Sequence, residues 1–135
     1  MIKRVHHIGI AVKNLEEAIS VYQNGLGLEV TKVTASELDG VKIAFLPTPE
    51  AEIELLEPTN PAGGVARFLE SRGEGIHHIA LEVDDIEAHM RKLEAAGAVL
   101  LDKKPRRGAD GLVAFIHPKS MKGVLVELVQ RDREG

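Results

Sequence analysis

Two pairs of adjacent histidines have the residue type and the spacing that could support chemistry. His6-His7 begins the segment HHIGIAVKNLE and His77-His78 begins HHIALEVDDIE, so matched positions are 71 residues apart throughout. Glutamates recur in the same way, because Ile53-Glu54-Leu55 matches Val126-Glu127-Leu128 at an offset of 73. Imidazole nitrogens and carboxylate oxygens form a mixed ligand set that suits a divalent metal ion. This internal duplication therefore indicates a metal site to which each half of the chain contributes one His and one Glu.

The alternation of side chains along the predicted strands selects one histidine of each pair. In the strand predicted over residues 5–12, large apolar residues share the expected core face, and His7 lies on the other face beside small residues, as in a cavity wall. His78 has the same parity in its own strand, and the preceding histidine of each pair is predicted to be structural. A lone strand Glu is usually solvated, but both glutamates stand between apolar neighbours, and both are duplicated. The predicted metal ligands are His7, Glu54, His78 and Glu127.

Each half of the chain carries the elements needed to position these side chains. Asn14 in the first half, and Asp84 or Asp85 in the second, are predicted helix N-caps that follow the opening strands. Strand-like segments follow each helix, at residues 28–34, 41–46 and 51–57 and at residues 98–102, 112–117 and 123–130. Each half is therefore predicted to be a β-α-β-β-β module, over approximately residues 4–58 and 76–130. Residues 59–75 form a connector with a short helix, and residues 1–135 are predicted to be a single α+β domain.

The composition excludes several classes of protein. Seventeen Lys and Arg residues against twenty-one Asp and Glu residues give a net charge of −4, which disfavours binding to nucleic acid or to an anionic membrane. The absence of cysteine excludes disulfide scaffolds, cysteine-ligated zinc and thiol nucleophiles. No apolar run approaches the ~20 residues of a membrane helix. We therefore expect a soluble, cytoplasmic protein.

The local sequence around these motifs resembles a known family. Besides the opening motifs, the ending His117-Pro118-Lys119, followed by GVLVEL over residues 123–128, is similar to that of the methylmalonyl-CoA epimerases, a family of the vicinal-oxygen-chelate superfamily. The resemblance covers about residues 4–130. It implies the glyoxalase-like fold, in which two β-α-β-β-β modules pair within one domain. Glyoxalase I, extradiol dioxygenases, fosfomycin-resistance enzymes and bleomycin-binding proteins share this fold.

The resemblance also implies an activity. It implies an isomerase that interconverts (R)- and (S)-methylmalonyl-CoA by removing and returning the α proton through a metal-stabilised enolate. The family's metal ligands fall on the four predicted residues, although some relatives carry Gln at the position of Glu54; cobalt is the expected ion, with manganese, nickel or zinc as alternatives. Glu127 and Glu54 are the candidate acid–base residues. One branch of the family has another Glu in the strand after Gly40, where this chain has Val41-Lys42-Ile43, so the second acid–base group stays open.

Other assignments also stay open. His117 and Lys119 are candidate contacts for the substrate carboxylate or the CoA phosphates, although Pro118 fits a simple turn equally well. The basic run over residues 103–107 is either a solvated loop or a landing patch for CoA phosphates. Alternatives to the epimerase are a glyoxalase I-like lyase and a metal-free drug-binding protein. The expected partners are a CoA thioester and a second copy of the chain in a homodimer, with no nucleic acid and no membrane.

Overall fold

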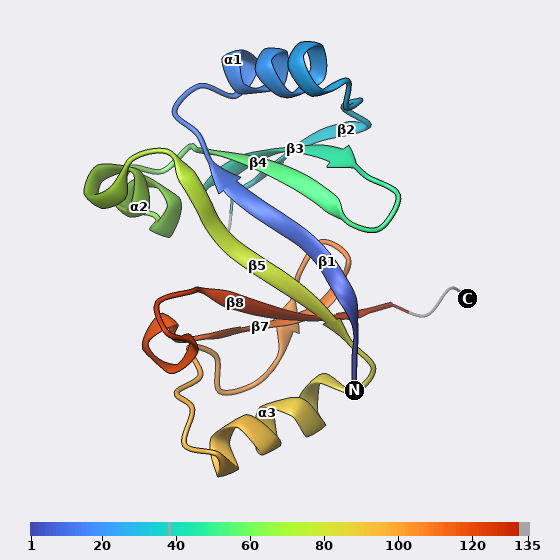
Figure 1. The fold of residues 1–135 in the computed structure, drawn as a ribbon. Helices are drawn as coiled ribbons and strands as arrows, with labels where there is room; N and C mark the ends of the chain where they lie inside the picture. Colours follow the sequence, from blue (N-terminus) through green and yellow to red (C-terminus); the bar gives the residue numbers. More distant parts are fainter. Residues whose placement is uncertain (38, 133–135) are drawn as a thin grey trace. The chain divides into compact units, whose positions relative to one another are not determined.

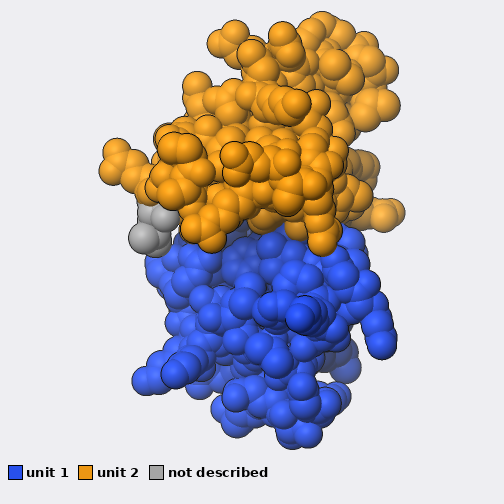
Figure 2. All heavy atoms as spheres, turned by 90° about the vertical axis from the view of Figure 1, so that its left-hand side faces the viewer, with its two compact units in different colours: residues 1–6, 78–135 blue, residues 7–77 orange. Residues whose placement is uncertain are grey.

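The structure, a computed structural model, describes residues 1–37 and 39–132. It divides into two compact units, coloured separately in Figure 2. We call residues 7–77 unit 2, and residues 1–6 together with residues 78–135 unit 1. Within the described residues, no helix is long and apolar enough to cross a bilayer.

Unit 2 is built on the strand order β2-β3-β4-β1 (Figure 1). Its elements are β1 (Ile2–Ala11, of which residues 7–11 belong to this unit), α1 (Leu15–Ser20), β2 (Lys32–Ser36), β3 (Val41–Pro47), β4 (Glu52–Pro58) and α2 (Gly64–Arg72). Strand β1 runs parallel to β4, and the other neighbouring strands are antiparallel. The predicted β-α-β-β-β order and the connector helix are thus confirmed in this half.

Unit 1 repeats this plan with the strand order β5-β8-β7-β6. Its elements are β5 (Gly75–Val83, from residue 78 onward), α3 (Ile86–Ala95), β6 (Arg106–Arg107), β7 (Gly111–Ile116) and β8 (Val126–Arg131). Strand β5 runs parallel to β8, which is the counterpart of the β1–β4 pairing in unit 2. The α+β class and the duplicated β-α-β-β-β order predicted from the sequence are therefore confirmed.

The first six residues of the chain are held on unit 1 by ion pairs. The Met1 ammonium donates to Asp84 Oδ1 at 2.7 Å, and Arg4 Nε donates to Glu82 Oε1 at 2.9 Å. The hydrogen bond from the ammonium lowers the pKa of Asp84 below its usual value, although this carboxylate is exposed. These contacts hold the start of β1 beside the end of β5.

The helix N-caps follow the sequence closely. The Asn14 side chain accepts a hydrogen bond from the Glu17 amide at 2.9 Å, as predicted. In the second module the cap is Asp85, whose Oδ1 accepts from the Ala88 amide at 3.1 Å, so the choice between Asp84 and Asp85 is settled. Helix α1 then continues into a π-helical segment over Val21–Gly25, which periodicity alone did not distinguish from regular helix.

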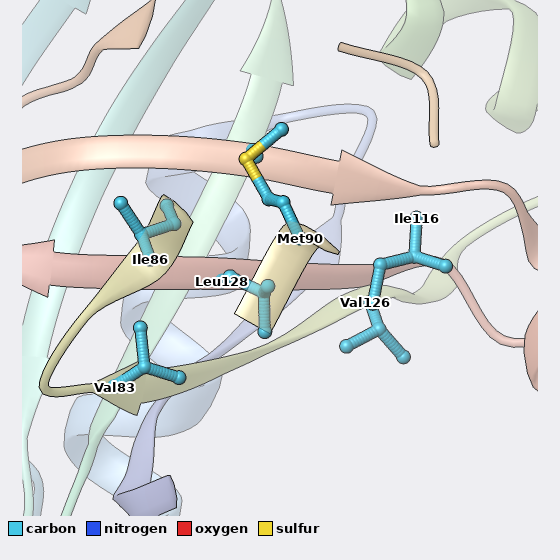
Figure 3. Close-up of a cluster of buried hydrophobic side chains, with 7 residues drawn as sticks. Val83, Ile86, Met90, Ile116, Val126 and Leu128 are labelled. Carbon is cyan, nitrogen blue, oxygen red and sulfur yellow. The ribbon is translucent and has the colours of Figure 1, made fainter. Parts of the chain in front are cut away.

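Apolar side chains cover the strands of each unit. In unit 1, α3 packs on one sheet face through the cluster shown in Figure 3, formed by Val83, Ile86, Met90, Ala114, Ile116, Val126 and Leu128. In unit 2, α1 covers the corresponding face through Val12, Leu15, Ala44, Leu46 and Leu55. Helix α2 covers the opposite face through Ala11, Val41, Leu56 and Val65. Ala11 lies on the same face of β1 as His7 and is buried under α2. This end of the face is therefore part of the core, and the prediction of a cavity wall is wrong there.

Two predicted strands were placed wrongly. The segment 28–34 is shifted, because β2 covers Lys32–Ser36. The segment 98–102 forms only an isolated bridge between Leu100 and Ile116, and the strand lies at residues 106–107, inside the basic run expected to be a loop or patch. The ladder stops here because Asp102 Oδ2 accepts the Phe115 amide hydrogen at 2.7 Å, so a side chain takes a donor that a strand partner would use.

A glycine at the start of β7 permits the closest backbone approach in unit 1 among the glycines described. Gly111 has φ +155°, and a Cβ there would overlap the Gln130 carbonyl oxygen and lie 2.9 Å from Arg131 Cα, both in β8. Neither backbone atom can rotate away. We expect Gly111→Ala to lower the free energy of unfolding by about 2–4 kcal/mol, measured by urea denaturation.

Gly64 in α2 supplies the matched control. A Cβ there meets nothing within 4 Å, and the residue is helical. Gly64→Ala is expected to raise the free energy of unfolding by about 0.5–1 kcal/mol, because alanine restricts the unfolded chain. Equal stabilities for the two variants would contradict the steric argument.

Candidate metal centre

In unit 2, β1 and β4 bring His7 and Glu54 together. The parallel register sets Gly9 opposite Glu54, so Glu54 lies on the same face as His7 two residues away. His7 Nδ1 is 3.3 Å from Glu54 Oε2. Both residues are only 5% exposed, which separates Glu54 from an ordinary solvated strand glutamate.

In unit 1, β5 and β8 bring His78 and Glu127 together in the same way. The register sets Ala80 opposite Glu127, and His78 Nε2 is 3.2 Å from Glu127 Oε1. His78 and Glu127 are 6% and 7% exposed. The two His–Glu pairs, which we call half-sites, therefore have the same strand origin, the same parity and nearly the same separation.

A phenylalanine on the neighbouring strand lies beside each half-site. Phe45 on β3 lies opposite Glu54, and Phe115 on β7 lies opposite Glu127. The Phe115 ring meets the His78 ring edge-on, with centroids 5.8 Å apart and an interplanar angle of 78°. The sequence argument missed these rings, although their 70-residue spacing follows the duplication and could have identified them.

The donor chemistry of each half-site fits a divalent cation. Imidazole nitrogen and carboxylate oxygen bind such ions at about 2.1 Å, so two adjacent ligands lie about 3.0–3.4 Å apart. Both observed N···O separations, 3.3 and 3.2 Å, fall in this range. A buried carboxylate also needs a compensating charge, which a divalent metal ion supplies.

The remaining histidine of each pair has another environment. His6 is buried in unit 1 with Nε2 4.0 Å from Asp110 Oδ2. The His77 ring packs edge-on against Phe68 of α2 in unit 2, with centroids 5.2 Å apart. Both are placed as structural residues, in agreement with their parity.

His117 and Lys119 lie at a turn in unit 1. His117 Nδ1 accepts a hydrogen bond from the Lys119 amide at 3.0 Å and so caps the 3₁₀ turn Pro118–Met121. The Lys119 side chain is exposed. The imidazole thus has a local structural role, and contact of either residue with a substrate stays a prediction.

The strand after Gly40, in which the resemblance raised the question of a second carboxylate, carries apolar and basic side chains at Val41-Lys42-Ile43. Ile43 packs in the cluster under α2 and lies opposite Leu56 in the register. Lys42 lies opposite Glu57, whose Oε1 accepts the amide hydrogen of Leu15 at the start of α1. This strand therefore supplies no acid–base carboxylate.

Comparison with known proteins gives likenesses over nearly the whole chain. The sequence profile of the Glyoxalase/Bleomycin resistance protein/Dioxygenase superfamily matches residues 6–115. The chain is 45% identical over 133 residues to the ethylmalonyl-CoA/methylmalonyl-CoA epimerase of Cereibacter sphaeroides, covering 96% of this chain and 99% of that protein. The structure of methylmalonyl-CoA epimerase from Mycobacterium tuberculosis matches with a TM-score of 0.92 at 36% identity, over 98% of this chain and 90% of that chain. A variant of the Streptomyces coelicolor methylmalonyl-CoA epimerase, in complex with 2-nitronate-propionyl-CoA, matches with a TM-score of 0.91 at 36% identity, over 98% of this chain and 100% of that chain.

Proposed function

This chain belongs to the Glyoxalase/Bleomycin resistance protein/Dioxygenase superfamily, and we propose that it is an isomerase that interconverts (R)- and (S)-methylmalonyl-CoA. The observation that carries the proposal is the pair of equivalent buried His–Glu half-sites, one in each module. The full-length likeness to named epimerases supports the choice of substrate. The motif ending in GVLVEL, which contains Glu127 on β8, also supports it.

We further propose that His7, Glu54, His78 and Glu127 hold one divalent metal ion, cobalt in the first instance, with manganese, nickel or zinc as alternatives. The separations and burial within each half-site support this assignment. One ion shared by four ligands requires the modules at residues 4–58 and 76–130 to act as a single domain, as the sequence predicts. When bound, the ion acts as a Lewis acid toward the substrate oxygens and makes the α proton more acidic.

The side chains of the half-sites then have distinct tasks. Glu127 accepts the α proton as the C–H bond breaks, and the electron pair delocalises onto the thioester oxygen to form the enolate. A second group returns a proton to the opposite face of the planar carbon, which inverts the configuration. Glu54 is the proposed second group, because it is the counterpart of Glu127 and because Val41-Lys42-Ile43 carries no carboxylate. Phe45 and Phe115 line the glutamates with apolar surface and limit access of water to them.

Proton exchange tests this reaction directly. Metal-loaded protein incubated with (R)-methylmalonyl-CoA in D₂O is expected to incorporate deuterium at the α carbon while the (S) form accumulates to equilibrium. Mass spectrometry measures the deuterium. A mutase specific for the (R) form, added after the reaction is stopped, measures the remaining (R) form and hence, by difference, the (S) form. Absence of both signals would overturn the proposed reaction while leaving the fold unaffected.

A parallel assay separates this activity from the other chemistry of the superfamily. The same preparation is given the hemithioacetal of glutathione and methylglyoxal, the substrate class of a glyoxalase I-like lyase. We expect no product above the uncatalysed rate.

A cytoplasmic location and a homodimeric state stay predictions. Light scattering on the purified protein measures the oligomeric state.

A further inference from the structure

The reaction scheme gives no task to Arg106, whose positive charge lies on the phenylalanine beside the half-site of unit 1. Arg106 Cζ is 5.5 Å from the centroid of the Phe115 ring. That same ring contacts His78 edge-on and belongs to the residue paired with Glu127 in the β7–β8 register. Phe115 therefore connects the Arg106 guanidinium to both predicted ligands of this unit.

The guanidinium is held in place from two sides. Arg106 Nε lies 3.4 Å from Asp102 Oδ1, and Asp102 Oδ2 accepts the Phe115 amide hydrogen at 2.7 Å. Asp102 thus contacts both the arginine and the backbone of the phenylalanine whose ring the arginine covers. The Arg106 side chain is 37% exposed, so it is partly desolvated and still accessible to a small molecule. A partly desolvated cation on an aromatic face is a preorganised anion-binding group.

The same arrangement occurs in unit 2. Lys32 Nζ is 5.9 Å from the centroid of the Phe45 ring, and Phe45 lies opposite Glu54. Each unit therefore places a cation on the phenylalanine that neighbours its predicted ligand glutamate. The two cations come from strands of different length, since β6 has two residues and β2 has five.

We propose that Arg106 binds the free carboxylate of the acyl group and so makes the site selective for thioesters of dicarboxylic acids; this rests on the proposed function. The charges of Glu54 and Glu127 balance that of a bound divalent ion, so a fixed cation nearby supplies the further positive charge that favours a substrate carboxylate. Among cationic side chains, the planar guanidinium is the one whose N–H groups match both oxygens of a carboxylate. Binding of the CoA phosphates by Arg106 is the other source of the same anionic chemistry, and the experiment separates the two.

The test compares Arg106→Gln with Arg107→Gln. Arg107 is the adjacent residue of β6, is 60% exposed, and pairs with Asp132 at 2.8 and 2.7 Å. Arg107→Gln therefore removes one arginine from the same strand and serves as the matched control. Calorimetry on metal-loaded protein gives Kd for malonyl-CoA, which has a carboxylate, and for propionyl-CoA, which has none. We expect Arg106→Gln to raise Kd for malonyl-CoA by about 10- to 100-fold. Kd for propionyl-CoA should change less than about twofold, and Arg107→Gln should change neither.

Each outcome is decisive. An equal rise in Kd for both thioesters would mean that Arg106 binds CoA phosphates, and it would overturn the carboxylate assignment, as would no change in either. If Arg106→Gln does not fold, Arg106→Lys keeps the charge and loses the planar fork; it should still weaken malonyl-CoA selectively. Binding can be measured without turnover. If the wild-type protein exchanges no deuterium but Arg106→Gln still weakens malonyl-CoA binding selectively, the epimerase reaction is wrong and the carboxylate assignment stands.

Discussion

Replacing Glu127 with glutamine is expected to reduce epimerisation at least about 10³-fold without unfolding the protein. The change keeps the shape of the side chain on β8, between Val126 and Leu128 of the unit 1 core, so packing is preserved. It removes the negative charge that Glu127 offers to the proposed metal ion and the basic oxygen that accepts the α proton. Steady-state kinetics with (R)-methylmalonyl-CoA measure the loss, and thermal unfolding checks the fold.

Glu82 offers a matched control for this variant. It is also a buried carboxylate, 5% exposed, and it has the parity of His78 on β5, but its partners are Arg4 at 2.9 Å and Lys3 at 3.7 Å. Glu82→Gln should cost about 1–3 kcal/mol of stability, because a buried charge-assisted hydrogen bond is lost, and should leave kcat within about threefold. If Glu127→Gln retains more than a tenth of the wild-type rate, or if the two variants lose activity equally, the assignment of Glu127 is wrong.

Duplication is the reason why so much of the half-sites could be predicted from the sequence. The face on which a single histidine lies does not show whether it is a ligand. Here His7 and His78 occupy the same face of their strands in both halves, and Glu54 and Glu127 also recur. The structure places each predicted His within 3.3 Å of the predicted Glu of its own unit. Period-two alternation fixes the face of a side chain, and the parallel register between first and last strands then fixes its neighbour.

The errors arise where long-range contacts override local pattern. Residues 98–102 are apolar enough for a strand, yet Val99 and Leu101 are more than half exposed, because Asp102 closes the ladder on Phe115. The burial of Ala11 under α2 depends on where a connector helix docks, which no spacing within β1 encodes. The contact between Arg106 and the Phe115 ring also depends on a long-range pairing, since it joins the two-residue strand β6 to β7.

Removal of the metal ion is expected to abolish turnover and to lower thermal stability together. Because the proposed ligands come from both modules, binding of the ion adds stability to the folded chain alone, by about 2.7 kcal/mol when free metal is 100 times Kd. For a chain of this size that corresponds to a rise in Tm of roughly 10 °C. Calorimetric unfolding of chelator-treated protein, with and without added Co²⁺, measures the shift, and the activity of the same samples is assayed in parallel.

Single-ligand variants show whether both half-sites hold the same ion. His7→Ala in unit 2 and His78→Ala in unit 1 should each remove most of the Co²⁺-dependent rise in Tm, because one ion cannot be held by the other half-site alone with comparable affinity. Glu54→Gln should retain part of it, since an amide oxygen can still ligate. His77→Ala, which removes the ring contact with Phe68 and none of the proposed ligands, should keep the full rise at a lower starting Tm. A full Co²⁺ effect in either His7→Ala or His78→Ala would mean that the two half-sites do not share an ion.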